Sequence, residues 1–144
     1  MRKKFNLLIG ESTAEKIKKE IGTAIPTSNN VFLMKGRDIR TGTPKEISLT
    51  EEDACEALMP ILSQMLAAIK EALESTPPEL SADLVDMGLV LTGGGALLKN
   101  IDKLISKDTG LPVTIADNPL ECVATGTGKA LENEELFSTM LSEY

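Results

Sequence analysis

The sequence contains no histidine and no tryptophan, and aromatic residues make up only 3 % of it. Without histidine, the chain has no imidazole for acid–base catalysis, no histidine-containing triad and no ligand set for most zinc sites. With so few aromatic rings, we do not expect nucleic-acid bases to stack on the surface. The sequence therefore predicts no metal site and no catalytic residue of these kinds.

Positive charge and cysteine are also scarce. The net charge is −7, which disfavours DNA, RNA or an anionic membrane as the main partner. The two cysteines, Cys55 and Cys122, each lie in an amphipathic helical pattern, and we expect reduced core thiols in a cytosolic protein. No apolar run is long enough for a signal peptide or a transmembrane segment. A cytoplasmic, soluble protein is predicted.

The first part of the chain predicts helices and a small antiparallel sheet. Met1–Leu8 looks like the end of a helix whose beginning is absent. Ser12 and Glu15 form a capping-box pair that should start a second helix, which Gly22 ends. Its buried face would consist of Ala14, Ile17 and Ile21.

A hairpin and a long helix are expected next. Val31–Met34 and Glu46–Leu49 are typical of paired strands, separated by turn residues. Thr50 and Asp53 should cap a long amphipathic helix. Pro60 lies inside that helix, where the missing N–H should bend or break it, so we interpret Pro60 as a lobe boundary.

The remaining part predicts the order β-α-β-α, which favours a parallel strand pair in an α/β layer. A short helix over Leu80–Val85 precedes a strand over 89–92, and a second strand covers Val113–Ile115. Gly110 should close the helix between the strands, and Asn118-Pro119 should open the last helix. Small residues give that last helix a face for close packing: Ala124, Gly126, Gly128 and Ala130.

The most informative motif is the run of glycines from Gly93 to Gly95, which follows the apolar strand and leads into a helix. Glycines allow positive φ and let a flat ligand lie on the peptide planes. The helix N-terminus adds unpaired N–H groups and a positive dipole end. This arrangement suits a nucleotide, although a tight turn with no ligand has the same spacing.

A second motif lies on the helix that begins near Ser12. Glu15, Lys18 and Lys19 share one face of it. They are interpreted either as a solvated set of ion pairs or as a polar edge that binds ribose and adenine. The spacing alone does not decide between these two alternatives.

Several segments together carry a family resemblance. They are similar, in the same order, to segments of the bacterial actin homologue MreB, a rod-shape-determining family in the actin/Hsp70 ATPase superfamily. The resemblance extends to about Glu132. The matching segments are Asn6–Glu11, Thr13–Lys18, Gly36–Asp38, Thr76–Leu80, Leu91–Leu98, Pro119–Ala124 and Gly126–Glu132.

The resemblance implies an α/β fold, namely the second-domain portion of the actin/Hsp70-like ATPase fold. Lobe IIB would cover residues 10–59, with helices and a small antiparallel sheet. Lobe IIA would cover residues 60–144, with the glycine turn, and residues 1–9 would be a partial helix of lobe IIA.

The resemblance also implies a nucleotide site for ATP or ADP, which full-length family members bind with Mg²⁺. Gly93, Gly94, Gly95 and Ala96 would lie against the adenine and the α-phosphate. Glu15, Lys18 and Lys19, with Lys16 less directly, would reach the ribose and base. The family's phosphate hairpins and Mg²⁺ ligands belong to a part that precedes this stretch, so the chain alone is expected to lack ATPase activity. It would be either a truncated chain or a natural short paralogue.

The implied partners are other protomers in a filament and the proteins of cell shape and cell-wall synthesis at the inner face of the membrane. An alternative is a stand-alone protein-interaction module of the same fold that uses no nucleotide.

Overall fold

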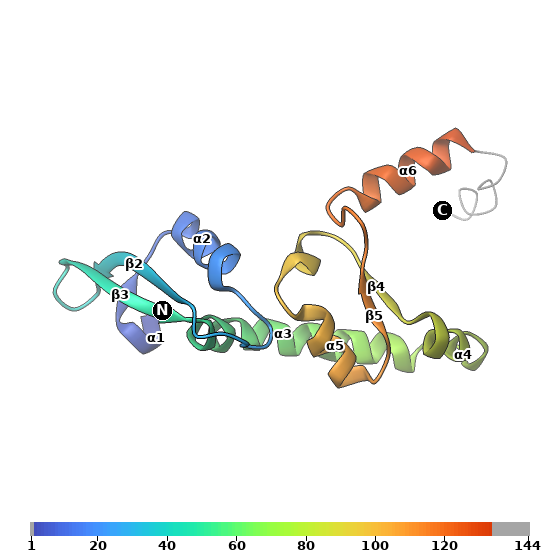
Figure 1. The fold of residues 1–144 in the computed structure, drawn as a ribbon, viewed down its shortest axis with the longest axis horizontal. Helices are drawn as coiled ribbons and strands as arrows, with labels where there is room; N and C mark the ends of the chain where they lie inside the picture. The colour runs from blue at the N-terminus through green and yellow to red at the C-terminus, as the bar shows by residue number, and fades with distance from the viewer. Residues whose placement is uncertain (1, 134–144) are drawn as a thin grey trace.

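The computed structural model describes residues 2–133, in which two lobes lie along one long helix (Figure 1). The first lobe consists of α1 (Arg2–Phe5), β1 (Leu7–Leu8), α2 (Glu11–Ile21), β2 (Val31–Asp38) and β3 (Pro44–Thr50). The long helix is α3 (Glu51–Glu74). The second lobe consists of α4 (Pro78–Met87), β4 (Leu89–Leu91), the 3₁₀ turn η1 (Gly94–Leu97), α5 (Ile101–Thr109) and β5 (Val113–Ile115), and α6 (Cys122–Glu132) follows it.

The first lobe is an antiparallel sheet in the order β1-β2-β3, packed against α2 and the start of α3. The predicted hairpin is confirmed and is longer than expected, because Val31 pairs with Thr50 and Arg37 with Pro44. Alternate side chains of β2 face the core, as the two-residue period of a strand requires. The buried core of this lobe is Leu7, Ile17, Ile21, Met34, Leu49 and Ala54.

The start of the chain differs from the sequence prediction. The helix expected over Met1–Leu8 ends at Phe5, because Asn6 takes a left-handed conformation with φ of 51°. Asparagine tolerates this conformation better than most residues. Leu7 then pairs with Asp38 of β2 and is completely buried. Leu7 and Leu8 therefore belong to the sheet of the first lobe, whereas the assignment of the helix before them to lobe IIA stays a prediction.

The helix α3 connects the two lobes. The predicted cap is confirmed: Thr50 Oγ1 accepts a hydrogen bond from the Asp53 N–H, and the Asp53 carboxylate accepts one from the Thr50 N–H. The helix runs without interruption through Pro60, so the predicted break is absent. Ala54 near its start packs in the first core, whereas Leu62 packs in the second. A lobe boundary at Pro60 stays a prediction.

The second lobe contains a parallel pair, β4 and β5, in which Leu89 pairs with Val113 and Leu91 with Ile115. This confirms the predicted parallel arrangement. The core between the strands, α3 and α5 has the buried residues Ala24, Leu62, Ile101 and Ile105. On the rest of this lobe, large apolar side chains are exposed, among them Val90 on β4.

The two predicted helix starts in this half are wrong. No α-helix directly follows the glycines, because the short 3₁₀ helix η1 covers Gly94–Leu97 and α5 begins only at Ile101. Asn118, with φ of 49°, forms a turn in which its carbonyl accepts from the Glu121 N–H, so α6 starts at Cys122. The expected close packing of the small residues of α6 is also absent, since a side chain at Gly126 or Gly128 would meet no atom within 4 Å. Figure 1 shows α6 standing away from both cores.

The two cysteines are unpaired and differ in burial. Cys55 is a core thiol, as predicted: it donates a hydrogen bond to the Ala24 carbonyl, and burial raises the pKa of its thiol. Cys122 is partly exposed, so the prediction of a core thiol is wrong there. None of the helices within residues 2–133 is long and apolar enough to cross a membrane.

Candidate functional site

Helix α2 carries four of the predicted site residues. Glu15 and Lys19 form an ion pair of 2.8 Å, and both side chains are mostly exposed. The Lys19 ammonium lowers the pKa of the Glu15 carboxyl. The predicted capping box between Ser12 and Glu15 is wrong, because Gly10 is the N-cap residue and no side chain bonds there. Glu15 is therefore available to Lys19, one turn further along the helix.

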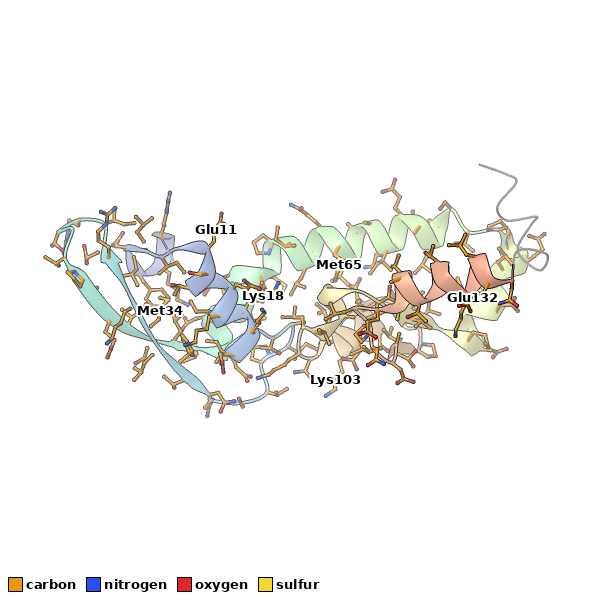
Figure 2. The ribbon with its side chains drawn as sticks, turned by 90° about the horizontal axis from the view of Figure 1, so that it is seen from above. Glu11, Lys18, Met34, Met65, Lys103 and Glu132 are labelled. Carbon is orange, nitrogen blue, oxygen red and sulfur yellow. The ribbon has the colours of Figure 1, made fainter. Side chains whose placement is uncertain are left out.

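Lys18 and Glu15 line a pocket between α2 and α3. The pocket has a volume of about 330 Å³, and its walls are mostly apolar. Figure 2 shows Lys18 near the middle of the molecule, where α2 approaches α3. The other lining residues are Ile9, Ala14, Ile17, Ala54, Ala57 and Leu58. Ala14, predicted to be buried, is exposed on this side of α2.

Lys16 lies apart from the other charged residues of α2. Its Nζ is 6.0 Å from the centre of the Phe32 ring, a cation–π distance, so the side chain lies toward β2. The structure thus brings Glu15, Lys18 and Lys19 together and directs Lys16 toward the sheet.

The glycine turn follows β4. Gly93 has φ of 79°, a value that strongly favours glycine, and its N–H donates to the Pro119 carbonyl at 2.7 Å. Ala96 is 4 % exposed, and its N–H donates to the Gly93 carbonyl. Ala96 therefore shapes the turn from inside, and its side chain is not on the surface.

The next two glycines present bare backbone. An added Cβ at Gly95 would meet no heavy atom within 4 Å, and one at Gly94 would meet only Leu120, at 3.4 Å. Neither residue has a positive φ. Their backbone and packing would thus accept a side chain, which makes the open space beside them suitable for a flat ligand.

Polar residues that the sequence did not indicate connect the two motifs. The Ala24 N–H donates to the Lys99 carbonyl at 2.8 Å, and Thr23 and Lys99 form an isolated parallel bridge. The Asn100 amide donates to Thr23 Oγ1 at 3.2 Å and to the Ile25 carbonyl at 2.9 Å. The end of α2 and the segment after the glycine turn therefore lie side by side. Neither local segment carried a signal of this contact.

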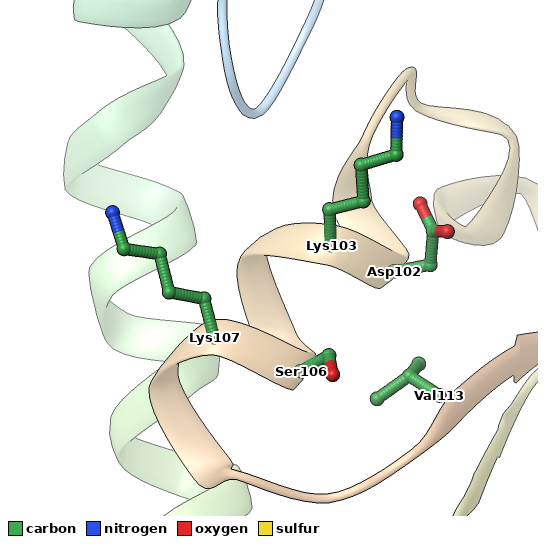
Figure 3. A pocket seen from close by; sticks show the side chains of 5 residues that line it. All are labelled: Asp102, Lys103, Ser106, Lys107 and Val113. Atoms are coloured by element: carbon green, nitrogen blue, oxygen red, sulfur yellow. The ribbon is translucent and has the colours of Figure 1, made fainter.

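A second hollow, on α5, contains none of the predicted site residues. It is lined by Asp102, Lys103, Ser106, Lys107 and Val113, and Figure 3 shows the two lysines pointing apart. Within residues 2–133, no group of three acidic or cysteine side chains is placed to hold a metal ion. The predicted site residues therefore lie on α2 and in the glycine turn, and none of them lines this hollow.

Comparison with known proteins identifies related sequences. Residues 1–139 match the family described as MreB/Mbl protein. The chain is 48 % identical over 134 residues to the cell shape-determining protein Mbl of Bacillus cereus, covering 92 % of this chain and 40 % of that protein. It is 47 % identical over 133 residues to MreB of Escherichia coli, covering 92 % and 38 %. The chain thus spans about two fifths of the length of these curated relatives.

Solved structures of the same fold also match. The crystal structure of MreB5 of Spiroplasma citri bound to ADP aligns with a TM-score of 0.87 and 36 % identity, over 98 % of this chain and 43 % of that one. The MamK double helical filament aligns with a TM-score of 0.60 and 25 % identity, over 80 % and 35 %. The chain therefore belongs to the MreB/Mbl protein family and has part of its actin-like fold.

Proposed function

We propose that this chain supplies the adenosine-binding side of an ATP/ADP site in an actin-like filament protein that determines cell shape. The observation that carries the proposal is the bare backbone at Gly94 and Gly95, on the lobe that faces the charged helix α2. The relationship to MreB5, whose structure is described as bound to ADP, supports it. In this proposal, lobe IIB covers residues 10–59 together with strand β1, and lobe IIA begins near Pro60.

The residues divide into two groups by role. Gly93, Gly94 and Gly95 offer backbone to the adenine and the α-phosphate, and Ala96 holds the turn in shape. Glu15, Lys18 and Lys19 offer hydrogen bonds to the ribose and base, which requires the Glu15–Lys19 ion pair to rearrange. This exchange is inexpensive because both side chains are exposed. Lys16 has a secondary role, since it lies near Phe32.

The nucleotide would carry Mg²⁺ on its phosphates, and we assign no residue of 2–133 to that ion. The metal would neutralise phosphate charge, whereas the residues described here bind and orient the nucleoside end. Phosphoryl transfer depends on groups placed around the phosphates. We therefore assign this part of the site to binding and not to catalysis.

We further propose that the chain takes part in self-association along a filament, at the cytoplasmic face of the membrane, with proteins of cell-wall synthesis as partners. A related protein, MamK, is described as a double helical filament. The exposed apolar side chains of the second lobe and α6 are consistent with contacts to another protein surface. They include Val85, Met87, Val90, Leu97, Leu120, Val123 and Leu131.

The nucleotide proposal is tested by titrating ADP into the labelled chain and following backbone NMR shifts. We expect shifts at residues 15–19 and 93–96, with a dissociation constant in the millimolar range, roughly −4 kcal/mol. Gly95→Val should abolish these shifts, because the new side chain fills the open space that the ligand needs. Gly126→Val, on α6 with equally open surroundings, is the control and should bind as the unchanged chain does. Shifts confined to other regions would reject the site.

The alternative is a protein-interaction module that uses no nucleotide, and the exposed apolar face of α6 is the observation in its favour. Under this alternative, ADP causes no shifts at either motif, while sedimentation still shows association. The two results together distinguish a nucleotide site from a surface for proteins alone.

A further inference from the structure

The two lobes touch at a second place besides α3. The segment 22–24 follows α2 and extends out of the first lobe, and it is nevertheless buried. Ala24 lies in the core of the second lobe, together with Leu62, Ile101 and Ile105. Thr23, beside it, has no exposed surface. A polar side chain in that position is stabilised only if it is fully hydrogen-bonded.

Thr23 is bonded across to the segment that follows the glycine turn. Its hydroxyl donates to the Ile25 carbonyl at 2.6 Å and accepts from the Asn100 amide at 3.2 Å. The same amide donates to the Ile25 carbonyl at 2.9 Å. Asn100 reaches both acceptors from a left-handed backbone, with φ of 59°. We call Thr23 and Asn100, with the carbonyl of Ile25, the polar latch.

The polar latch lies between the two halves of the candidate site. Lys18 and Lys19 are in the last turn of α2, a few residues before Thr23. Asn100 follows the glycine turn after only a few residues as well. The Lys99 side chain adds a further link, because its Nζ donates to the Glu20 carbonyl at 3.0 Å. Any change in the angle between the lobes at this point changes the separation of the two motifs.

Helix α3 alone is a weak restraint on that angle. Pro60 lies in α3 between Ala54, which packs in the first core, and Leu62, which packs in the second. Proline removes one backbone hydrogen bond and is a common cause of helix kinks. A second attachment between the lobes would prevent bending there.

We propose that Thr23 and Asn100 are positioning residues, which fix the angle between the lobes and so hold the two halves of the nucleotide site at binding distance. The part that concerns binding rests on the function proposed above, whereas the part that concerns the angle does not. Neither side chain is assigned a contact with the nucleotide.

The first experiment measures the orientation of the lobes by residual dipolar couplings in the 144-residue chain. In the unchanged protein, one alignment tensor should fit both lobes. In Asn100→Gly, each lobe should need its own tensor, because glycine keeps the left-handed backbone but removes the amide. Asn6→Gly is the matched control, since Asn6 is also left-handed but lies in the first lobe, before the β1 strand. A single tensor in Asn100→Gly would overturn the proposal.

The second experiment measures ADP affinity by NMR titration. Asn100→Gly and Thr23→Val should weaken binding by about tenfold, a change of about 1.4 kcal/mol. Thr23→Ser keeps the hydroxyl and should restore binding to that of the unchanged chain, even if it lowers thermal stability. A merely structural role of Thr23 would instead make affinity follow stability in both Thr23 variants.

The two readouts separate the possible failures. If the unchanged chain does not bind ADP, the proposed function fails, and the dipolar couplings still decide whether the polar latch fixes the lobes. If Asn100→Gly loosens the lobes but binds ADP normally, the positioning role is wrong. If Asn100→Gly does not fold, the couplings of Thr23→Val and Thr23→Ser decide the same question.

Discussion

The two lobes of this chain complete their cores to different degrees. In the first lobe, a three-stranded sheet closes over α2, and Leu7 and Leu49 have no exposed surface. In the second, a two-stranded sheet carries most of its apolar residues at half burial, and Val90 on β4 is 62 % exposed. A sheet generally needs at least three strands or a covering helix to be stable by itself. The first lobe meets this condition with three strands, whereas the second depends on α3 and α5 and leaves apolar side chains such as Val90 exposed.

The largest expected effect tests this difference directly. Leu49→Ala should lower the free energy of unfolding by about 3–5 kcal/mol, because it opens a cavity in a closed core. The same change at Leu104, which is half-buried on α5, should cost less, about 1–3 kcal/mol. Urea unfolding measures both. Leu33→Ala, at a position 64 % exposed, is the control and should stay within about 0.5 kcal/mol. Equal decreases in the free energy of unfolding for Leu49→Ala and Leu104→Ala would contradict the proposed difference between the two cores.

The next effect concerns the helix between the lobes. Pro60→Ala should raise the free energy of unfolding by about 1–3 kcal/mol, because alanine restores a helical hydrogen bond and a better helix propensity. Urea unfolding followed by circular dichroism measures the change. A loss of stability would show that proline at this position relieves strain that a straight helix creates between the lobes.

Helix capping gives a smaller effect and a sharp control. Thr50→Ala should cost about 1 kcal/mol, because it removes the acceptor for the Asp53 N–H. Ser12→Ala should change stability by less than about 0.5 kcal/mol, since no side chain caps α2. The melting temperatures of the two variants test this order. A comparable loss at Ser12 would mean that the capping box forms in solution.

Acid should weaken the attachment of the first lobe to α3. The Glu51 carboxylate accepts hydrogen bonds from the Ser28 hydroxyl and from the Thr27 and Ser28 N–H groups, and these lower its pKa. A lowered pKa stabilises the folded state above the unfolded value, near 4.5, and this contribution disappears as pH falls from there through the folded pKa.

The pH dependence can be assigned by substitution. Unfolding followed between pH 6 and pH 2, values chosen to bracket the ordinary carboxyl range, should show a flatter profile for Glu51→Gln. Glu52→Gln, at an exposed neighbouring position, should keep the steeper profile. An identical profile in the Glu51 variant would assign the acid sensitivity to other carboxyls.

The smallest effect on stability should accompany a change in association. Val90→Lys replaces an exposed apolar side chain of the second lobe and should alter the free energy of unfolding by less than about 0.5 kcal/mol. It should lower concentration-dependent association, because a charged residue then lies on the exposed face of β4. Sedimentation measures this. Val31→Lys, on the first lobe at 58 % exposure, is the control and should associate as the unchanged chain does.

Local patterns predicted much of the fold. The Thr50–Asp53 cap, the hairpin and the Gly110 helix end each depend on residues close in sequence, and all three formed as predicted. The helix starts predicted at Ser12 and Asn118 are wrong. Gly10, and not Ser12, is the N-cap residue of α2, and the left-handed Asn118 forms a turn before α6. The local sequence indicates which caps and helix boundaries a segment can form, and tertiary contacts decide which of them it adopts.

The candidate site, too, was predicted only where residues close in the sequence determine its geometry. The spacing of Glu15 and Lys19 is enough to predict an ion pair, and the pair is present. The direction of the Lys16 side chain depends on Phe32, which lies on β2. The residue pattern of helix α2 does not indicate that this strand lies beside it. The bonds of Thr23 to Asn100 join residues that are far apart in the chain. Nothing in either local segment predicts such a contact.

The unequal cysteines have a practical consequence for chemical labelling. Cys55 is buried in the core, and burial raises the pKa of its thiol, so little reactive thiolate is present. Cys122 is partly exposed and is the first residue of α6, just after the loop whose Pro119 carbonyl accepts a hydrogen bond from the Gly93 N–H. A maleimide dye should therefore attach at Cys122 first, without any engineered cysteine. The chain thus contains a natural attachment point for a fluorescent reporter beside its glycine turn.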